Sequence, residues 1–378
     1  MKLQKKILLV HLHSNGDCLY ATAVARQIKQ DYPGGHLTWA VASFCKDILN
    51  NNPYIDAILE IPNVNKGNSA SVLRKLKKEM AVEKNNGVYD EVFYTQLLDS
   101  EIANYDGCIR SGIFRGYDKP ITVPVTPVLR LKEEEIEKVK KFAEKHNLSG
   151  YKNVILFEFA PQSGQLAISL PAAFEITKRL IKNKNTAVIL SSNIKITEEE
   201  NIIDGSVLTL RETAYLTHYC TFLIGCTSGI SWASTSDAAK QLPTLQIIDP
   251  YSPWVNPMSR DFQRFGISSK NLLEIYDNDV EKIVACTQDI LNNGFAEAKK
   301  KYYSPLPLHF IGTSKGIYNM LCFLQFKDII RHIRINVGIY GWHPLLIKAI
   351  IIGFITAPFK LTYHIIKKRV AKEIKSFI

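Results

Sequence analysis

Paired cysteines are missing from this 378-residue sequence, although it contains seven cysteines. No two of them form a C-x-x-C pair, which excludes a zinc ribbon and a dithiol redox motif. An odd, scattered set of thiols fits a reducing compartment. The apolar run near the N-terminus is only four residues long, so we expect no secretory signal peptide.

Two nucleotide-binding motifs and the usual metal motifs are absent as well. The sequence has no G-x-G-x-x-G and no G-x-x-x-x-G-K-[ST], so neither a dinucleotide fingerprint nor a Walker loop is supported. No cluster of His and Cys has the spacing of metal ligands. We therefore expect a protein without a metal and without a cofactor.

Basic charge is concentrated at one end of the chain. The net charge is +11, and residues 327–378 hold ten Lys/Arg and two acids, which leaves a nearly balanced body. A balanced body argues against nucleic acid as a partner. The tail also holds 25 mostly apolar residues, Ile335–Phe359. We expect this tail to lie on a membrane surface as an in-plane or re-entrant anchor, with a single span or a hairpin of the soluble fold as alternatives.

Strands and helices are expected to alternate along most of the sequence. This pattern is typical of α/β proteins with parallel sheets, and two successive alternations predict two Rossmann-like domains that face a cleft. We expect a first Rossmann-like domain over residues 1–130, a second over 131–310 and a basic helical tail over 311–378. The expected strands are Lys6–His13, Leu37–Val41, Ala57–Ile61, Glu91–Tyr94, Val154–Phe159, Ala187–Leu190, Phe222–Gly225 and, as the last clear one, Leu245–Ile248.

A polar turn at Ser14–Asp17 (SNGD) separates the first strand from the following helix. Gly16 permits close approach to the backbone, and the N-terminus of the helix favours a neighbouring anion. Asp17 is placed to accept a proton from a substrate hydroxyl. The alternative interpretation is that Asp17 only caps the helix, as Asp commonly does.

A second turn, Gly225–Ser231 (GCTSGIS), also follows an apolar strand and opens a helix. Its small residues, hydroxyl groups and exposed backbone N–H groups would make a cradle for a diphosphate. The alternative is a capped helix with a tight turn. A third turn, Pro161–Gln165 (PQSGQ), follows the first strand of the second alternation and offers a similar anion-facing surface.

Histidines and cysteines near these turns are weaker candidates. His11 and His13 alternate along the first strand and share one face, so one of them is a candidate for reaching the cleft. A hydrogen-bonded strand histidine is the more common case. Cys220 and Cys226 are expected in the core rather than as nucleophiles, because no histidine partner is evident nearby in the sequence.

The two glycine-containing turns, in this order, resemble glycosyltransferase family 9, the heptosyltransferase-like enzymes. In the first half the resemblance is carried by Ser14–Ala23, by Tyr32-Pro33 with the strand Leu37–Trp39, and by Asn52–Pro62 (NPYIDAILEIP). In the second half Gly225–Trp232 is similar to the family's G-x-D-S-G-x-x-H turn. The resemblance covers about residues 5–250 and implies the two-domain GT-B fold, with an N-terminal acceptor domain over residues 1–130 and a nucleotide-sugar domain over 131–310.

This sequence departs from the family pattern at three places. Thr227 stands where the family usually has Asp, and Trp232 stands where it usually has His. The lysine that usually follows the first turn of the second domain is not evident near Ser163–Leu170.

The family resemblance implies an activity and a set of site residues. It implies an inverting, metal-independent transfer of a hexosyl or heptosyl group from a nucleotide sugar to a hydroxyl of a lipid-linked or cell-surface glycan, of the lipopolysaccharide type. Asp17 would be the general base, and the protein would work at the cytoplasmic face of the bacterial inner membrane. The expected substrate-binding residues are His13, Ser14, Asn15, Gly16, Ser163, Gly164, Gln165, Arg211, Glu212, Thr227, Ser228, Gly229 and Ser231.

Within that set the resemblance implies different tasks. Ser163, Gly164 and the Thr227–Gly229 turn would face the donor diphosphate, and Arg211 with Glu212 would lie near the nucleoside. Two other functions remain open at this point. One is a catalytically degenerate GT-B protein that binds a nucleotide sugar or glycan, and the other is a GT-B-like nucleotide-sugar epimerase.

Overall fold

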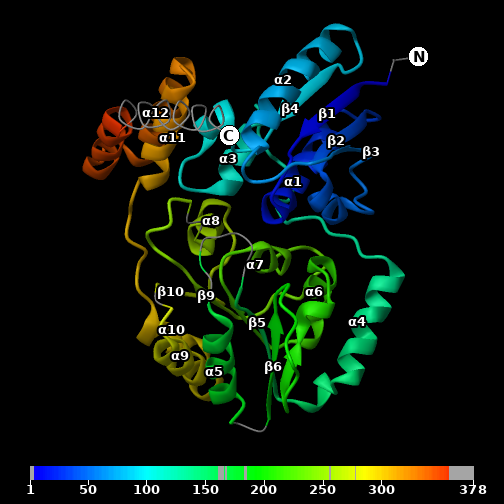
Figure 1. Ribbon diagram of the computed structural model, residues 1–378, viewed down its shortest axis with the longest axis vertical. Coiled ribbons are helices and arrows are strands. Elements are labelled where there is room, and N and C mark those ends of the chain that lie inside the picture. Colours follow the sequence, from blue (N-terminus) through cyan, green and yellow to red (C-terminus); the bar gives the residue numbers. More distant parts are fainter. Residues whose placement is uncertain are drawn as a thin grey trace, which may run out of the picture.

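The fold is α/β, with two parallel sheets that lie one after the other along the length of the molecule (Figure 1). The structure is a computed structural model, and it confirms the expected class. It describes residues 4–160, 166, 168–182, 185–254, 257–276 and 278–356.

The first domain is built on a four-stranded parallel sheet in the order β3-β2-β1-β4. The central strand β1 is apolar and buried at four of its five positions, because helices cover both of its faces. The elements are β1 (Lys6–Val10), α1 (Asn15–Asp31), β2 (His36–Ala42), η1 (Ser43–Leu49), β3 (Ala57–Ile61), α2 (Ser69–Asn85), β4 (Glu91–Tyr94), η2 (Asp99–Asn104) and α3 (Ile109–Arg115).

The second domain is built on a six-stranded parallel sheet in the order β10-β9-β8-β5-β6-β7. Two of these strands, β7 and β10, were not expected from the sequence, which placed the last clear strand before Asp249. The elements are α4 (Glu133–Lys145), η3 (Leu148–Gly150), β5 (Asn153–Glu158), α5 (Leu170–Leu180), β6 (Thr186–Ser191), β7 (Ile202–Asp204), η4 (Gly205–Val207), α6 (Leu210–Leu216), η5 (Thr217–Tyr219), β8 (Phe222–Gly225), α7 (Gly229–Ala233), β9 (Thr244–Ile247), α8 (Met258–Arg264), β10 (Leu272–Ile275), α9 (Val280–Asn293) and α10 (Phe295–Tyr302).

Both sheets have the strand order of a doubly wound fold. Numbered within its own domain, the second sheet runs 3-2-1-4-5-6, and the first sheet runs 3-2-1-4. The order reverses between β1 and β4 in the first sheet and between β5 and β8 in the second. Ligands of such folds bind outside the carboxyl ends of the strands at this reversal. The topology therefore directs attention to the turns after β1, β5 and β8.

The chain returns to the first domain after α10, as the orange and red helices in Figure 1 show. Helix α11 (Ile311–Cys322) and helix α12 (Phe326–Tyr340) pack against η2. In α12, His332 Nδ1 lies 3.1 Å from the carbonyl oxygen of Ala103, and Asn336 donates to the carbonyl oxygen of Tyr105 at 3.1 Å. These helices are therefore part of the folded body of the first domain.

The long apolar stretch of the tail is divided in the structure. Helix α12 ends at Tyr340, Gly341 has a φ of 62°, and a further helical segment covers residues 344–356. In the described part of the chain, every helix falls short of the length and apolar character needed to cross a bilayer. The last three residues of the stretch, 357–359, lie outside the described residues.

Candidate functional site

The turns after β1 and β8 meet where the two domains touch. A Cβ atom added to Gly16 would lie 3.8 Å from Gly229 Cα and 3.1 Å from Trp232 Cδ1. A Cβ atom added to Gly229 would lie 3.8 Å from Asn15 Cβ. The structure therefore brings together two turns that are more than 200 residues apart in the sequence, at the strand-order reversals of both sheets.

The first turn places Asp17 in the opening turn of α1. Ser14 is exposed and is the N-cap residue of α1, and its side chain makes no capping hydrogen bond. The backbone N–H of Ser14 instead donates to the Asp17 carboxylate, and burial raises the pKa of Asp17 to about 7. The capping interpretation of Asp17 thus has support, and a carboxyl with this pKa is also matched to proton transfer near neutral pH.

The two histidines of the first strand take different positions. His11 is fully buried, its Nδ1 lies 3.0 Å from Thr95 Oγ1, and burial lowers its pKa to about 3. It is the hydrogen-bonded core histidine of the alternative interpretation. His13 is partly buried next to the turn, and its backbone N–H donates to Gln96 Oε1 at 2.8 Å.

Gln96 was not singled out in the sequence. It follows β4, and its Oε1 also accepts a hydrogen bond from the backbone of Leu12 at 2.8 Å. Its amide therefore joins the chain after β1 to the chain after β4, at the strand-order reversal. An isolated glutamine after a short strand gives no signal in the sequence, because its partners come from more than 80 residues away.

The second turn holds an internal carboxylate that the sequence did not single out. Glu158, at the end of β5, is 1% exposed, and its Oε2 accepts from the backbone N–H of Cys226 at 3.2 Å and from Ser231 Oγ at 3.0 Å. The backbone N–H groups of Ile230 and Ser231 donate to it as well. Burial raises the pKa of Glu158 to about 7 despite these donors. The only sequence signal is an acid at the end of an otherwise apolar strand.

The prediction that the backbone N–H groups of this turn are exposed is therefore wrong for some of them. The N–H of Cys226 serves Glu158, and the N–H of Thr227 donates to Gln246 Oε1 at 2.9 Å. Thr227 has a φ of 51° and is buried, and Ser228 is buried as well. Gly229 is the partly exposed residue of the turn that faces the first domain.

Arg211 and Glu212 hold elements of the fold together. Arg211 pairs with Glu135 of α4 at 2.7 Å, and it donates to the carbonyl oxygens of Asp47 and Asn50 in the first domain. Glu212 accepts from Lys138 at 2.8 Å and completes the capping box of α6. Their contact with a nucleoside stays a prediction, as do the tasks of Ser163, Gly164 and Gln165, which lie outside the described residues.

Aromatic and ionic contacts close the interface beside the two turns. Trp232 of α7 packs on Tyr20 of α1 with ring centroids 4.8 Å apart. Arg110 of α3 pairs with Asp261 of α8 at 3.0 Å, and both are almost completely buried. The Arg110 guanidinium also lies 4.5 Å from the centre of the Tyr20 ring. The two domains are thus in direct contact along α1 and α3.

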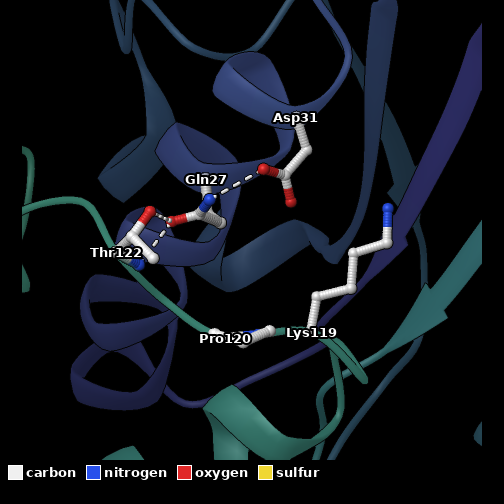
Figure 2. Close-up of a pocket in the computed structure, with 5 residues that line it drawn as sticks. All are labelled: Gln27, Asp31, Lys119, Pro120 and Thr122. Atoms are coloured by element: carbon white, nitrogen blue, oxygen red, sulfur yellow. Dashed lines mark hydrogen bonds between the residues drawn. The ribbon is translucent and has the colours of Figure 1, made fainter.

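A separate surface pocket of about 390 Å³ lies at the opposite end of α1 (Figure 2). The dashed lines in Figure 2 show Gln27 donating to Asp31 at 2.9 Å and accepting from Thr122. Lys119 contacts the hydroxyl of Tyr32 at 2.9 Å. The pocket is about 20 Å from Asp17 along the helix, at 1.5 Å per residue. It belongs to the connector between the domains rather than to the candidate site.

Comparison with known proteins establishes the fold. A glycosyl transferase family 9 protein from Veillonella parvula DSM 2008 matches with a TM-score of 0.51 and 14% identity, over 78% of this chain and 99% of its own. The E. coli ADP-heptose LPS heptosyltransferase II matches with a TM-score of 0.51 and 15% identity, over 76% and 99%. A UDP-N-acetylglucosamine 2-epimerase also matches, at 11% identity and a TM-score of 0.45, over 86% and 97%.

These structural similarities identify the fold. The chain has two Rossmann-like domains of the GT-B type, as the sequence resemblance predicted. Two of the structures that share this arrangement over most of the chain are the family 9 protein and the heptosyltransferase II. No family model matches the sequence, and no curated protein matches it either.

Proposed function

We propose that this protein is an inverting glycosyltransferase that moves a sugar from a nucleotide sugar to an acceptor hydroxyl. One observation carries the proposal. Asp17, a carboxyl whose pKa burial raises to about 7, stands at the strand-order reversal of one domain, and the neighbouring Gly16 faces Gly229 of the other. The GT-B fold supplies the arrangement in which a donor and an acceptor meet between two such domains.

The proposed chemistry needs one base and one stabilised leaving group. Asp17 accepts the proton of the acceptor hydroxyl while the oxygen attacks the anomeric carbon of the donor sugar. The bond from that carbon to the phosphate oxygen breaks, and the nucleoside diphosphate leaves as an anion. The backbone N–H groups of Ser228 and Gly229, which do not serve Glu158 or Gln246, stabilise this anion, and this lowers the barrier because the charge develops in the transition state.

Substrates enter only if the two domains separate. The side chain of Trp232 packs next to Gly16, and the turns that contain Gly16 and Gly229 are in van der Waals contact. A hinge motion that withdraws α7 from α1 would open room for the donor, as in other two-domain enzymes that close over their ligands. The acceptor is proposed to be a lipid-linked or surface glycan, used at the cytoplasmic face of a bacterial inner membrane.

The test is donor turnover by the full chain. Purified protein is incubated with a panel of nucleotide sugars and glycan acceptors, and release of the nucleoside diphosphate is measured. Asp17→Asn should reduce release by about 10²-fold or more, since it keeps the size of the side chain but removes the base. Asp118→Asn, at an exposed aspartate of the same domain, is the control and should leave release unchanged. Full turnover in Asp17→Asn would refute the assignment of the base.

A second function is favoured by the closed interface. Glu158 occupies N–H groups that a diphosphate would use, and Trp232 fills the space beside Gly16. These features fit a GT-B protein that binds a nucleotide sugar or glycan without turnover. This function predicts ligand binding that Asp17→Asn leaves intact, together with no release of nucleoside diphosphate by the unmodified chain.

A further inference from the structure

The C-terminal helices expose large apolar side chains to solvent. We define the C-terminal apolar face as Phe326 and Ile330 of α12, Trp342 of the following turn, and Ile351, Ile352 and Ile355 of the segment 344–356. Trp342 is 67% exposed, and Phe326 and Ile355 are each 57% exposed. Scattered apolar residues are normal on a surface, but a concentration of them marks an interaction site.

Helix α12 carries apolar residues on its solvent side as well as on its packed side, where Ile329 is 3% exposed. Its packed side buries His332 and Asn336, each 0% exposed, against the carbonyl groups of the chain around η2. Its solvent side carries Phe326 and Ile330 at a spacing of four residues, which is one stripe of a helix. Ile329 and Ile333 pack in the core, whereas Phe326 and Ile330 are available to something other than the protein's own core.

The segment 344–356 is apolar on both sides. Leu346, Ala349 and Gly353 are buried at the spacing i, i+3 and i+7, and an added Cβ on Gly353 would lie 2.9 Å from Ile317 of α11. The opposite side presents Ile351 and Ile355. One side of the segment therefore fixes it to the fold, and the other side is left to solvent.

The charges around this face are basic. Lys348 lies on the same exposed side of its helix as Ile351 and Ile355. On α12, Lys327 and Arg334 lie on the exposed side next to Ile330. Asp328 is the only acid in residues 326–356, and the sequence of residues 357–378 adds six Lys/Arg and one acid. Apolar side chains flanked by Lys and Arg complement a bilayer whose headgroups are anionic.

We propose that the C-terminal apolar face binds the surface of an anionic lipid bilayer, with α12 and the segment 344–356 lying in the plane of the interface. Helix α12, with 15 residues, reaches about 22 Å, less than the core of about 30 Å that a span must cross. Apolar burial and electrostatic attraction act together, and stable peripheral binding requires two such signals. The proposal stands independently of the transferase activity.

The test is flotation of the full chain with vesicles of phosphatidylcholine alone or with added phosphatidylglycerol. We expect binding to the anionic vesicles, weakened by salt, and a blue shift of tryptophan emission that Trp342→Phe removes. The other tryptophans, Trp39, Trp232 and Trp254, are buried or partly buried, so they contribute little to this shift. Equal binding to both vesicle types, or no binding to either, would overturn the proposal.

Variants separate the two signals. Ile351→Asp with Ile355→Asp should reduce partitioning at least tenfold, while Val82→Asp with Val207→Asp, at exposed valines elsewhere, should leave it unchanged. Arg334→Gln and Lys348→Gln should each reduce binding to anionic vesicles about fivefold. Melting temperatures equal to that of the unmodified chain confirm folding. If the face instead covers a second copy of this chain, light scattering will give twice the monomer mass without vesicle binding, which would also refute the proposal.

Discussion

Asp17 and Glu158 are two carboxyls that lie near the first strand of each domain; Asp17 is partly buried, and Glu158 is 1% exposed. Asp17 follows the first strand of the first sheet, and Glu158 ends the first strand of the second sheet. Burial raises the pKa of each to about 7. Their hydrogen bonds differ, because Asp17 accepts one from the backbone N–H of Ser14 whereas Glu158 accepts several from the turn after β8.

The difference shows that a raised pKa does not by itself identify a catalytic group. A carboxyl whose lone pairs are filled by the protein acts as an anchor for the groups that donate to it. A carboxyl with a single internal partner retains acceptor capacity for a substrate proton. We therefore assign the base to Asp17 and assign to Glu158 the positioning of the turn around Gly229.

The largest expected difference is in stability. Glu158→Ala should lower the free energy of unfolding by about 3 kcal/mol, because it leaves several buried donors without an acceptor. Asp17→Ala should lower it by no more than about 1 kcal/mol, the usual effect of losing a cap. Urea denaturation measures both values. Equal losses in the two variants would remove the distinction between anchor and base.

The pH dependence of stability tests the role of Asp17 in the same comparison. The pKa of Asp17 rises from 3.8 to about 7 on folding, so the folded chain binds more protons between these values. Asp17 therefore reduces the free energy of unfolding as the pH rises from about 4 to about 7. Above pH 7, Asp17→Asn should melt at the same temperature as the unmodified chain or higher, yet turn over about 10²-fold more slowly.

Turnover by the unmodified chain should rise about tenfold per pH unit below pH 7, since the base must be ionised. The residual turnover of Asp17→Asn should lack this rise. Glu158→Gln keeps one acceptor oxygen and should retain the rise. A rise that persists in Asp17→Asn would show that another group is the base.

A smaller effect is expected on donor affinity. Gly229→Val places a branched side chain where the backbone faces Asn15, and a Cβ there already lies 3.3 Å from Leu210. The dissociation constant of the donor should rise about tenfold, with a smaller change in melting temperature. Isothermal calorimetry on the folded variant measures it, and an unchanged constant would contradict a donor site at this turn.

The smallest effect is expected at Gly16. Gly16→Ala would place its Cβ 3.1 Å from Trp232 Cδ1, so the indole must shift by a few tenths of an ångström. We expect a loss of stability of about 1 kcal/mol and altered emission of Trp232. Unchanged emission would mean that the two turns are not in contact in solution.

The sequence predicted the strands that are apolar runs between polar turns. The bounds of β3, β4 and β8 were predicted correctly, since each is an apolar run bounded by polar turns. Strand β7, with three residues, was missed, and so was β10, although it has four residues like β4 and β8. Such short strands are defined by their neighbours in the sheet rather than by their own periodicity.

The site could be predicted only where its geometry is local. The position of Asp17 at a strand-to-helix turn depends on residues 10–20 alone, and the structure places it there. The contacts of Glu158 and Arg211 could not be predicted from the sequence, because their partners lie about 70 residues or more away. Long-range partners decide whether a buried charge acts as an anchor or as a catalyst.

One measurement tests the central claim most directly, which is that a nucleotide sugar binds between the two turns. The full chain, Asp17→Asn and Gly229→Val are heated with a panel of nucleoside diphosphates and nucleotide sugars. We predict that one nucleotide raises the melting temperature of the full chain and of Asp17→Asn, by an amount equivalent to about 2.7 kcal/mol at a hundredfold excess over its dissociation constant. Gly229→Val should respond much less. A panel without any response, or an equal response in all three proteins, would contradict the account.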